Sequence, residues 1–482
     1  MRKPNLVVIM ADEMRGDAMG IAGHPDVLTP HLDSLAATGV YFPRAYSACP
    51  TCVPARATLM TGMKACHTGR VGYLDGVPWR YEHTLAGELS RAGYHTECCG
   101  KLHTYPLRNS LGFHHVELHD GHLHYFRGEN VKKYEYQPYA DDYFYWLRKE
   151  KGIDCDVNDT GMDCNSWLAR PWPYEEKTHP TRWVTDRSID FLRRRDREQP
   201  FFLFTSYVRP HAPYDAPQAF FDMYANKALR PPFSGDWDDR ERLKKQGRIY
   251  NNSVGPLDEE LIRRQQMGYY ACITQIDYEI GRLLSALTEA EVLNNTVILF
   301  LSDHGELLSD HCLNRKSLPY EGSARVPMIV NGPERLIGPS RVDESLVELM
   351  DVMPTLLTLA GAEIPENVDG KNMLAPMERE YLHGEHIYEG ESAQFIVTKR
   401  DKFVWYSGQM KEQYFDLTSD PTESRNRISD PDCQNRIQTL RNWLIRELEG
   451  REEGFSDGRS LLPGSRPSPV MKSLRKNDES RV

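Results

Sequence analysis

Continuous apolar runs, separated by amphipathic stretches, recur along most of this chain. The clearest runs are Leu6 to Met10, Phe201 to Thr205, Val297 to Leu301 and Met328 to Val330, and Tyr94 to Cys99 is a weaker one. Because the runs are continuous rather than alternating in polarity, they are typical of strands buried on both faces, as in a parallel sheet.

Helices are expected between these strands. The stretch from Asp258 to Leu287 carries apolar residues at helical spacing. The alternation of strand and helix predicts an α/β sandwich, in which helices flank a large mixed, mostly parallel sheet. We find no internal repeat.

Changes in composition and periodicity divide the chain of 482 residues into three expected parts. Residues 1–365 are expected to form the main domain, with an irregular insertion at about 105–180 that is rich in His, Tyr, Trp and Asp and lies over one end of the sheet. Residues 366–450 are expected to form a small C-terminal α+β subdomain with a short antiparallel sheet. Residues 451–482, rich in Ser, Pro, Gly and charge, are expected to be flexible or to pack along a neighbour.

The charge balance disfavours nucleic acid as a partner. The formal net charge is −11, from 59 Lys and Arg against 70 Asp and Glu, whereas nucleic-acid binders show a basic footprint. An anionic small substrate stays possible, because the local charge of a cleft matters more than the total.

Neither a membrane span nor a secretion signal is evident. No apolar stretch approaches the roughly 18 to 20 residues that cross a bilayer, and the apolar run near the N-terminus ends at Asp12. We therefore expect a cytoplasmic protein without membrane contact, or a periplasmic one if a leader has been removed. The ten cysteines do not form a disulfide framework pattern, so most are expected to be reduced and buried.

Charged or titratable residues follow four of the expected strands. In open α/β sheets ligands bind outside the carboxyl ends of the strands. Singly, an acidic pair of this kind is more often a helix cap, and short motifs recur by chance. It is their occurrence at four strand ends that indicates a site. The residues concerned are Asp12 and Glu13, Lys101 and His103, Arg209 and His211, and Asp303 and His304.

These residue types suit a pocket for a tetrahedral oxyanion. Hard oxygen ligands for Ca²⁺ or Mg²⁺ come from Asp12, Glu13 and Asp303, with His304 as a further contact. Fixed positive charge comes from Arg56, Lys101 and Lys316. His103 and His211 can move protons near neutral pH.

One cysteine stands where a helix is expected to begin. Cys52 precedes Pro54 in a helix that should run to about Met60, and proline is tolerated in a first helical turn. The N–H groups of that turn could bind an anion. A packed structural thiol is the simpler interpretation, and a nucleophile is the more specific one.

The stretch from Cys52 to Gly62, CVPARATLMTG, resembles the motif of the formylglycine-dependent (type I) sulfatases. Further elements resemble that family in the same order along the chain. They are Asn5 to Asp12, Gly100-Lys101-Leu102-His103, His211, Ser302 to Glu306, Lys316 with Tyr320 and Glu321, and Tyr414 to Asn426.

The resemblance implies the fold of alkaline phosphatase and a post-translational cofactor. A maturation enzyme would oxidise Cys52 to Cα-formylglycine, whose hydrate is the nucleophile. Asp12, Glu13, Asp303 and His304 would bind a divalent metal, for which we expect Ca²⁺ ahead of Mg²⁺ or Mn²⁺. The implied catalytic roles are orientation of the diol by Arg56 and Lys101, sulfate binding by Lys316, leaving-group protonation by His211 and breakdown of the sulfated intermediate by His103.

The expected activity is hydrolysis of a sulfate monoester, either a carbohydrate sulfate or an aryl sulfate. The main alternative is a phosphonate monoester or phosphodiester hydrolase of the same superfamily. A non-catalytic anion- or glycan-binding protein is disfavoured, because Cys52, Arg56, Lys101, His103, His211 and Lys316 occur together.

Overall fold

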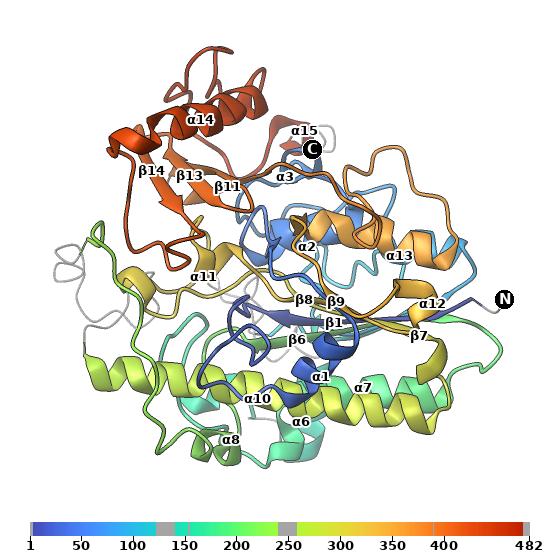
Figure 1. The fold of residues 1–482 in the computed structure, drawn as a ribbon. Helices are drawn as coiled ribbons and strands as arrows, with labels where there is room; N and C mark the ends of the chain where they lie inside the picture. Colours follow the sequence, from blue (N-terminus) through green and yellow to red (C-terminus); the bar gives the residue numbers. More distant parts are fainter. Residues whose placement is uncertain (1–2, 122–139, 153–154, 240–257, 389, 476–482) are drawn as a thin grey trace.

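An eight-stranded sheet crosses the middle of the molecule in the computed structural model, which describes residues 3–121, 140–152, 155–239, 258–388 and 390–475 (Figure 1). Its strand order is β5-β4-β6-β1-β7-β8-β2-β9. The strands are β1 (Asn5–Asp12), β2 (Val40–Tyr41), β4 (His95–Gly100), β5 (His115–Leu118), β6 (Phe201–Pro210), β7 (Thr296–Ser302), β8 (Met328–Asn331) and β9 (Arg341–Val342).

The sheet is mixed but mostly parallel, as the sequence predicted. Neighbours from β5 through β4, β6 and β1 to β7 all run parallel. Strand β8 runs antiparallel to both of its neighbours, β7 and β2. These five parallel strands therefore present their carboxyl ends along a single edge of the sheet.

Strand β1 shows why its apolar run is continuous. Val7 and Ile9 are buried in the cluster formed with the helices on one face, and Leu6, Val8 and Met10 are buried in the cluster on the other face. A strand that is covered on both sides needs apolar residues at every position.

Two layers of helices cover the sheet (Figure 1). One contains α1 (Pro30–Thr38), α7 (Pro180–Arg194) and the long α10 (Glu259–Glu289), and the other contains α2 (Cys52–Thr61), α4 (Leu85–Arg91) and α13 (Val352–Ala360). Further helices are α3 (Ala65–Thr68), α6 (Asp142–Lys151), α8 (Gln218–Asp222), α11 (Glu321–Ala324) and α12 (Glu334–Ile337). Beside the main sheet, β3 (Ala45–Tyr46) pairs with β10 (Val347–Glu348).

A four-stranded antiparallel sheet forms the expected C-terminal subdomain. Its strands are β11 (Leu382–Tyr388), β12 (Glu391–Val397), β13 (Asp401–Tyr406) and β14 (Lys411–Asp416), in that order. Helix α14 (Gln434–Leu448) packs on one face of this sheet. The other face, which includes Leu382 and Phe395, packs on Leu307 and Tyr320 of the main domain.

The segment after α14 packs on its own chain. Val71 N–H donates to Pro469 O at 3.0 Å, and Met471 N–H donates to Gly69 O at 2.9 Å. Phe455 is fully buried against Trp405. Of the two alternatives that their composition left open, flexibility and packing, residues 451–475 thus show packing, because their few apolar side chains reach core positions.

Two further expectations concern cysteines and membranes. All ten cysteines are free, and most of them are buried. Among the described residues, no helix has the length and apolar character needed to span a bilayer.

Helix α10 is expected to be a main source of stability, because it contacts α1, α7, α8 and β6. Ile280→Ala truncates a fully buried side chain in this helix and should lower the free energy of unfolding by about 2–5 kcal/mol. Urea denaturation followed by circular dichroism measures the change. Ser285→Ala, at an exposed position of the same helix, is the matched control and should stay within about 0.5 kcal/mol of the wild type. Equal stabilities of the two variants would contradict this prediction.

Candidate active site

The predicted site residues converge at the carboxyl ends of four adjacent parallel strands. Asp12 ends β1, Asp303 follows β7, Lys101 follows β4 and His211 follows β6. Because β4, β6, β1 and β7 are consecutive in the sheet, residues from four distant parts of the sequence meet in one place.

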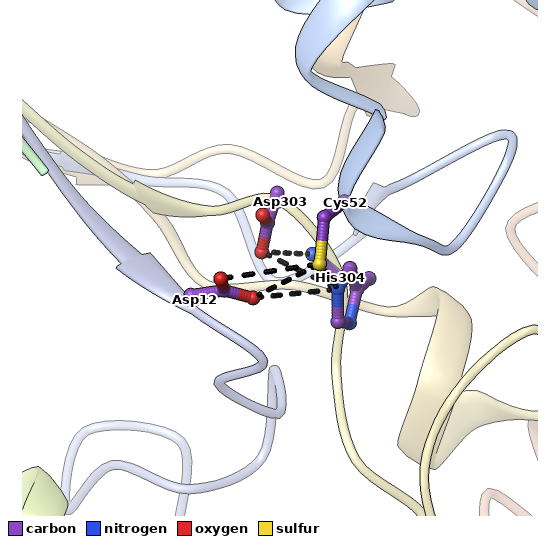
Figure 2. Close-up of side chains that lie close together, drawn as sticks. All are labelled: Asp12, Cys52, Asp303 and His304. Atoms are coloured by element: carbon purple, nitrogen blue, oxygen red, sulfur yellow. Dashed lines mark hydrogen bonds and ion pairs between the residues drawn. The ribbon is translucent and has the colours of Figure 1, made fainter. Parts of the chain in front are cut away.

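Cys52 is the first residue of α2 and lies at the centre of this group (Figure 2). Its side chain is 2% exposed. Its Sγ lies 3.2 Å from His304 Nε2, 3.5 Å from Asp12 Oδ1 and 3.7 Å from Lys101 Nζ. The N-terminal turn of α2 thus directs its side chain at position 52 into a cluster of acidic and basic groups, as expected for a nucleophile rather than a packed thiol.

Arg56 lies one helical turn after Cys52 and is buried among the same acidic groups. Its Nε donates to Asp303 Oδ2 at 2.9 Å, and its Nη1 donates to Lys101 O at 2.7 Å and to Ser206 Oγ at 3.1 Å. Its Nη2 lies 3.8 Å from Asp12 Oδ2. The guanidinium therefore joins the ends of β1, β4, β6 and β7.

Lys101 and His103 follow a glycine that the packing requires. Gly100 has φ +107°, and a Cβ at this position would lie 1.9 Å from Ser206 O. The backbone at Gly100 therefore passes close to that of Ser206. This close approach directs Lys101 Nζ at Asp12 Oδ2, with which it forms an ion pair. Asp120 holds the following turn by accepting the N–H groups of Leu102 and His103, each at 2.9 Å.

A group of oxygen and nitrogen atoms beside Cys52 fits a divalent cation. Ligand atoms of Asp12, Cys52, Asp303 and His304 lie within 4.8 Å of one another. His304 Nδ1–H donates to Gly305 O at 3.0 Å, which leaves the Nε2 lone pair directed at the cluster. Carboxylate oxygens are the donors that Ca²⁺ and Mg²⁺ prefer.

Glu13 borders this cluster in a strained conformation. Its φ is +73°, a region that residues other than glycine rarely adopt. Its N–H donates to Asp303 Oδ1 at 3.1 Å, and its buried Oε1 has no hydrogen-bond partner among the described residues. Such strain occurs where surrounding contacts hold a functional residue in place, and an unpaired carboxylate oxygen is available for a cation.

Lys316 and His211 form the opposite wall. Lys316 Nζ lies 2.8 Å from Glu13 Oε2 and 2.6 Å from His211 Nε2. Because His211 Nδ1–H donates to Ala212 O at 2.7 Å, its Nε2 accepts a hydrogen bond from the Lys316 ammonium. Lys316 thus fixes the orientation of the His211 ring.

Burial and neighbouring charges shift the pKa values of three site residues, Asp12, Glu13 and His211. Burial alone would raise the pKa of Asp12, but Lys101, His211 and Arg56 hold it well below its usual range. Burial raises the pKa of Glu13 well above its usual range, against the attraction of Lys316. Burial, and then the charge of Lys316, lowers the pKa of His211 well below its usual value.

The structure thus brings together all ten predicted residues, whose individual roles stay predictions. They are Asp12, Glu13, Cys52, Arg56, Lys101, His103, His211, Asp303, His304 and Lys316, each of them buried. Arg209, which the strand-end rule also indicated, instead forms an ion pair with Asp215 at 2.5 Å.

Three residues near the site were not predicted from the sequence. Asp75 Oδ1 lies 3.4 Å from His103 Nε2, and Asn165 Oδ1, from the insertion, lies 3.5 Å from Lys316 Nζ. Asp120 follows β5, so the strand-end rule would have found it if that short, polar strand had been predicted. No sequence signal marks Asp75 or Asn165, since both lie in loops.

Comparison with protein families agrees with this geometry. The Sulfatase family model matches residues 4–362. A second model, N-sulphoglucosamine sulphohydrolase, C-terminal, matches residues 309–450.

Individual proteins are similar over almost the whole chain. An arylsulfatase of Clostridium perfringens is 48% identical, covering 98% of this chain and 100% of that protein. The crystal structure of a phosphonate monoester hydrolase of Agrobacterium radiobacter shares the fold, with a TM-score of 0.76 at 23% identity over 92% of this chain and 95% of that one. A protein solved with its substrate D-glucosamine-2-N,6-O-disulfate has a TM-score of 0.71 at 19% identity over 93% and 98%. The fold is therefore that of the alkaline phosphatase-like superfamily, and the chain belongs to the sulfatase family of sulfuric ester hydrolases.

Proposed function

We propose that this sulfatase hydrolyses sulfate monoesters of hydroxylated alcohols, carbohydrate sulfates in the first place, with Cys52 as the precursor of its nucleophile. The observation that carries the proposal is the position of Cys52 Sγ, 3.2 Å from His304 Nε2 and 3.5 Å from Asp12 Oδ1 at the first turn of α2. A polar substrate is supported by the insertion, which brings Asn165 to the site.

The residues that would hold a divalent cation, for which we propose Ca²⁺, are Asp12, Asp303 and His304, with Glu13 beside them. A bound cation would supply positive charge for a sulfate oxygen and lower the pKa of a coordinated hydroxyl. All of these side chains are buried, so the cation would act in a site of low dielectric, where its charge is weakly screened.

Side chains of the protein orient the reacting groups. Converted to formylglycine, residue 52 would present its hydrate where Sγ now lies. Arg56 and Lys101 orient that residue and neutralise the carboxylates behind it. Because their pairing with Asp303 and Asp12 is already formed, these cations need little reorganisation when charge develops on the sulfate.

We assign proton delivery to the leaving oxygen to His211. The Lys316 Nζ–His211 Nε2 hydrogen bond of 2.6 Å holds the ring in place, and the Lys316 ammonium supplies positive charge for the sulfate oxygens. On the other side, His103 is supported by Asp75 and is placed to take a proton from residue 52. The maturation enzyme and the location, cytoplasmic or periplasmic, stay predictions.

Replacing Cys52 should abolish turnover without unfolding the protein. Cys52→Ala removes the modified residue, so sulfate release from 4-nitrophenyl sulfate should fall to background while the circular dichroism spectrum is kept. Matured wild type should weigh about 18 Da less than its sequence mass, the difference between cysteine and formylglycine. Cys66→Ala, at another free cysteine, is the control that should keep activity. Residual turnover in Cys52→Ala would exclude the assignment.

Removal of the metal should stop the reaction and destabilise the fold. Chelation is expected to abolish activity, and Ca²⁺ at about 100 times its dissociation constant should restore it and stabilise the protein by about 2.7 kcal/mol. Thermal unfolding with Ca²⁺, Mg²⁺ or Mn²⁺ measures the preference. Asp303→Asn should lose the stabilisation by Ca²⁺, whereas Asp196→Asn, at an exposed position, should keep it. Full activity in excess chelator would contradict the metal assignment.

Loss of His211 should lower kcat most for substrates with poor leaving groups. His211→Ala should lower kcat by about 10²–10⁴-fold for the sulfate of an aliphatic alcohol, and much less for 4-nitrophenyl sulfate, whose phenolate leaves without a proton. His95→Ala, at the opposite end of β4, is the control. An equal loss for both esters would show that His211 is not the acid.

The phosphonate alternative is tested with the same leaving group. Wild-type kcat/KM for 4-nitrophenyl sulfate should exceed that for 4-nitrophenyl phenylphosphonate. The reverse order would replace the proposed activity by phosphonate monoester hydrolysis.

A further inference from the structure

Strand β11 of the C-terminal subdomain is held between two segments that lead into the active site. Glu385 N–H donates to Ala48 O at 2.7 Å, and Ile387 N–H donates to Val71 O at 3.2 Å. Ala48 lies four residues before Cys52. Val71 precedes the loop that carries Asp75 to His103. His386 lies between the two residues that donate these hydrogen bonds.

His386 projects toward the main domain. Side chains two and four residues apart share one face of a strand, so His386 lies on the same face as Leu382. That face packs on Leu307, in the segment joining His304 to Lys316, and on Leu318, two residues after Lys316. Burial, and after it the charge of His304, lowers the pKa of His386 to about 3.

The imidazole of His386 is buried without a hydrogen bond. It is 3% exposed, and neither Nδ1 nor Nε2 has a partner among the described residues. Most buried polar groups in proteins are paired, and an unpaired one calls for an explanation. On the opposite face of β11, His383 Nε2 is paired with Gln394 Oε1 at 2.7 Å. The C-terminal subdomain thus offers one unused donor and one unused acceptor beside the site.

A sulfate group or a metal ion does not suit this position. Sulfate oxygens only accept hydrogen bonds, and the cations Arg56, Lys101 and Lys316 already surround Cys52. His386 is also absent from the groups of metal-ligand atoms that converge in the described part of the chain. A hydroxyl group both donates and accepts, and so matches a neutral imidazole.

We propose that His386 is a specificity residue, which binds a hydroxyl of the substrate's alcohol part next to the ester oxygen. This inference rests on the sulfatase activity proposed above. It makes the C-terminal subdomain part of the substrate site and predicts a preference for sulfate esters that carry a neighbouring hydroxyl.

Two aryl sulfates that differ in one hydroxyl test the proposal with matured, metal-loaded enzyme. They are 4-nitrocatechol sulfate, with a hydroxyl beside the ester, and 4-nitrophenyl sulfate, without it. The measured quantity is the ratio of their kcat/KM values. His386→Phe should lower this ratio by about 10-fold or more relative to wild type, because the phenyl ring cannot pair with the hydroxyl.

Three controls separate recognition from a structural role. His386→Gln keeps a donor and an acceptor and should restore part of the ratio. His383→Phe, on the other face of β11, should leave the ratio unchanged. The Tm of His386→Phe should not fall, because that substitution breaks no hydrogen bond of the described structure.

Two results would overturn the proposal. The first is an unchanged ratio in His386→Phe. The second is an equal loss on both esters together with a lower Tm, which would give His386 a structural role. Failure of the proposed function can be distinguished from failure of this inference. A wild type that cleaves aryl sulfates but no sugar sulfate excludes the carbohydrate assignment. A changed kcat/KM ratio in His386→Phe would still support the role of this residue.

Discussion

Charge pairing inside a buried site is the constraint on which the rest of this structure depends. Removing a carboxylate or an ammonium group from water costs several kcal/mol unless an opposite charge compensates it. Here Asp12 pairs with Lys101, Asp303 with Arg56 and Glu13 with Lys316. Each acidic residue that could hold a cation thus has a basic partner that could hold a sulfate oxygen, so one balanced set of charges serves the fold and the reaction.

The parallel sheet makes this pairing possible. Its consecutive strands β4, β6, β1 and β7 end at one edge, where loops can carry polar groups and the strands themselves stay apolar. Helix α2 adds Cys52 and Arg56 from one turn of helix. Strain at Glu13, with φ +73°, is held by contacts from both neighbouring strand ends. A rigid scaffold of this kind suits catalysis by groups that are oriented before the substrate arrives.

Parts of the chain far from this edge complete the site. The insertion reaches Lys316 through Asn165, and it is anchored by the pairing of Ala169 with Tyr214, three residues after His211. The C-terminal sheet packs on the segment between His304 and Lys316. Under the proposed function, the charged centre is separate from the insertion and the C-terminal sheet, which would contact the alcohol part, so substrate preference can change without changing the chemistry.

By itself, the sequence determined five strands of the sheet (β1, β4, β6, β7 and β8), the mixed and mostly parallel character of that sheet, the C-terminal subdomain and the ten residues of the site, Cys52 among them. These features are local: apolar runs report burial on both faces, and the motif from Cys52 to Gly62 is continuous in the chain. Only the tertiary structure decided that β8 runs antiparallel, that Arg209 pairs with Asp215 and that Asp75, Asn165 and His386 lie beside the site. The physical reason is that such contacts depend on how distant loops and sheets pack, which no local pattern of residues records.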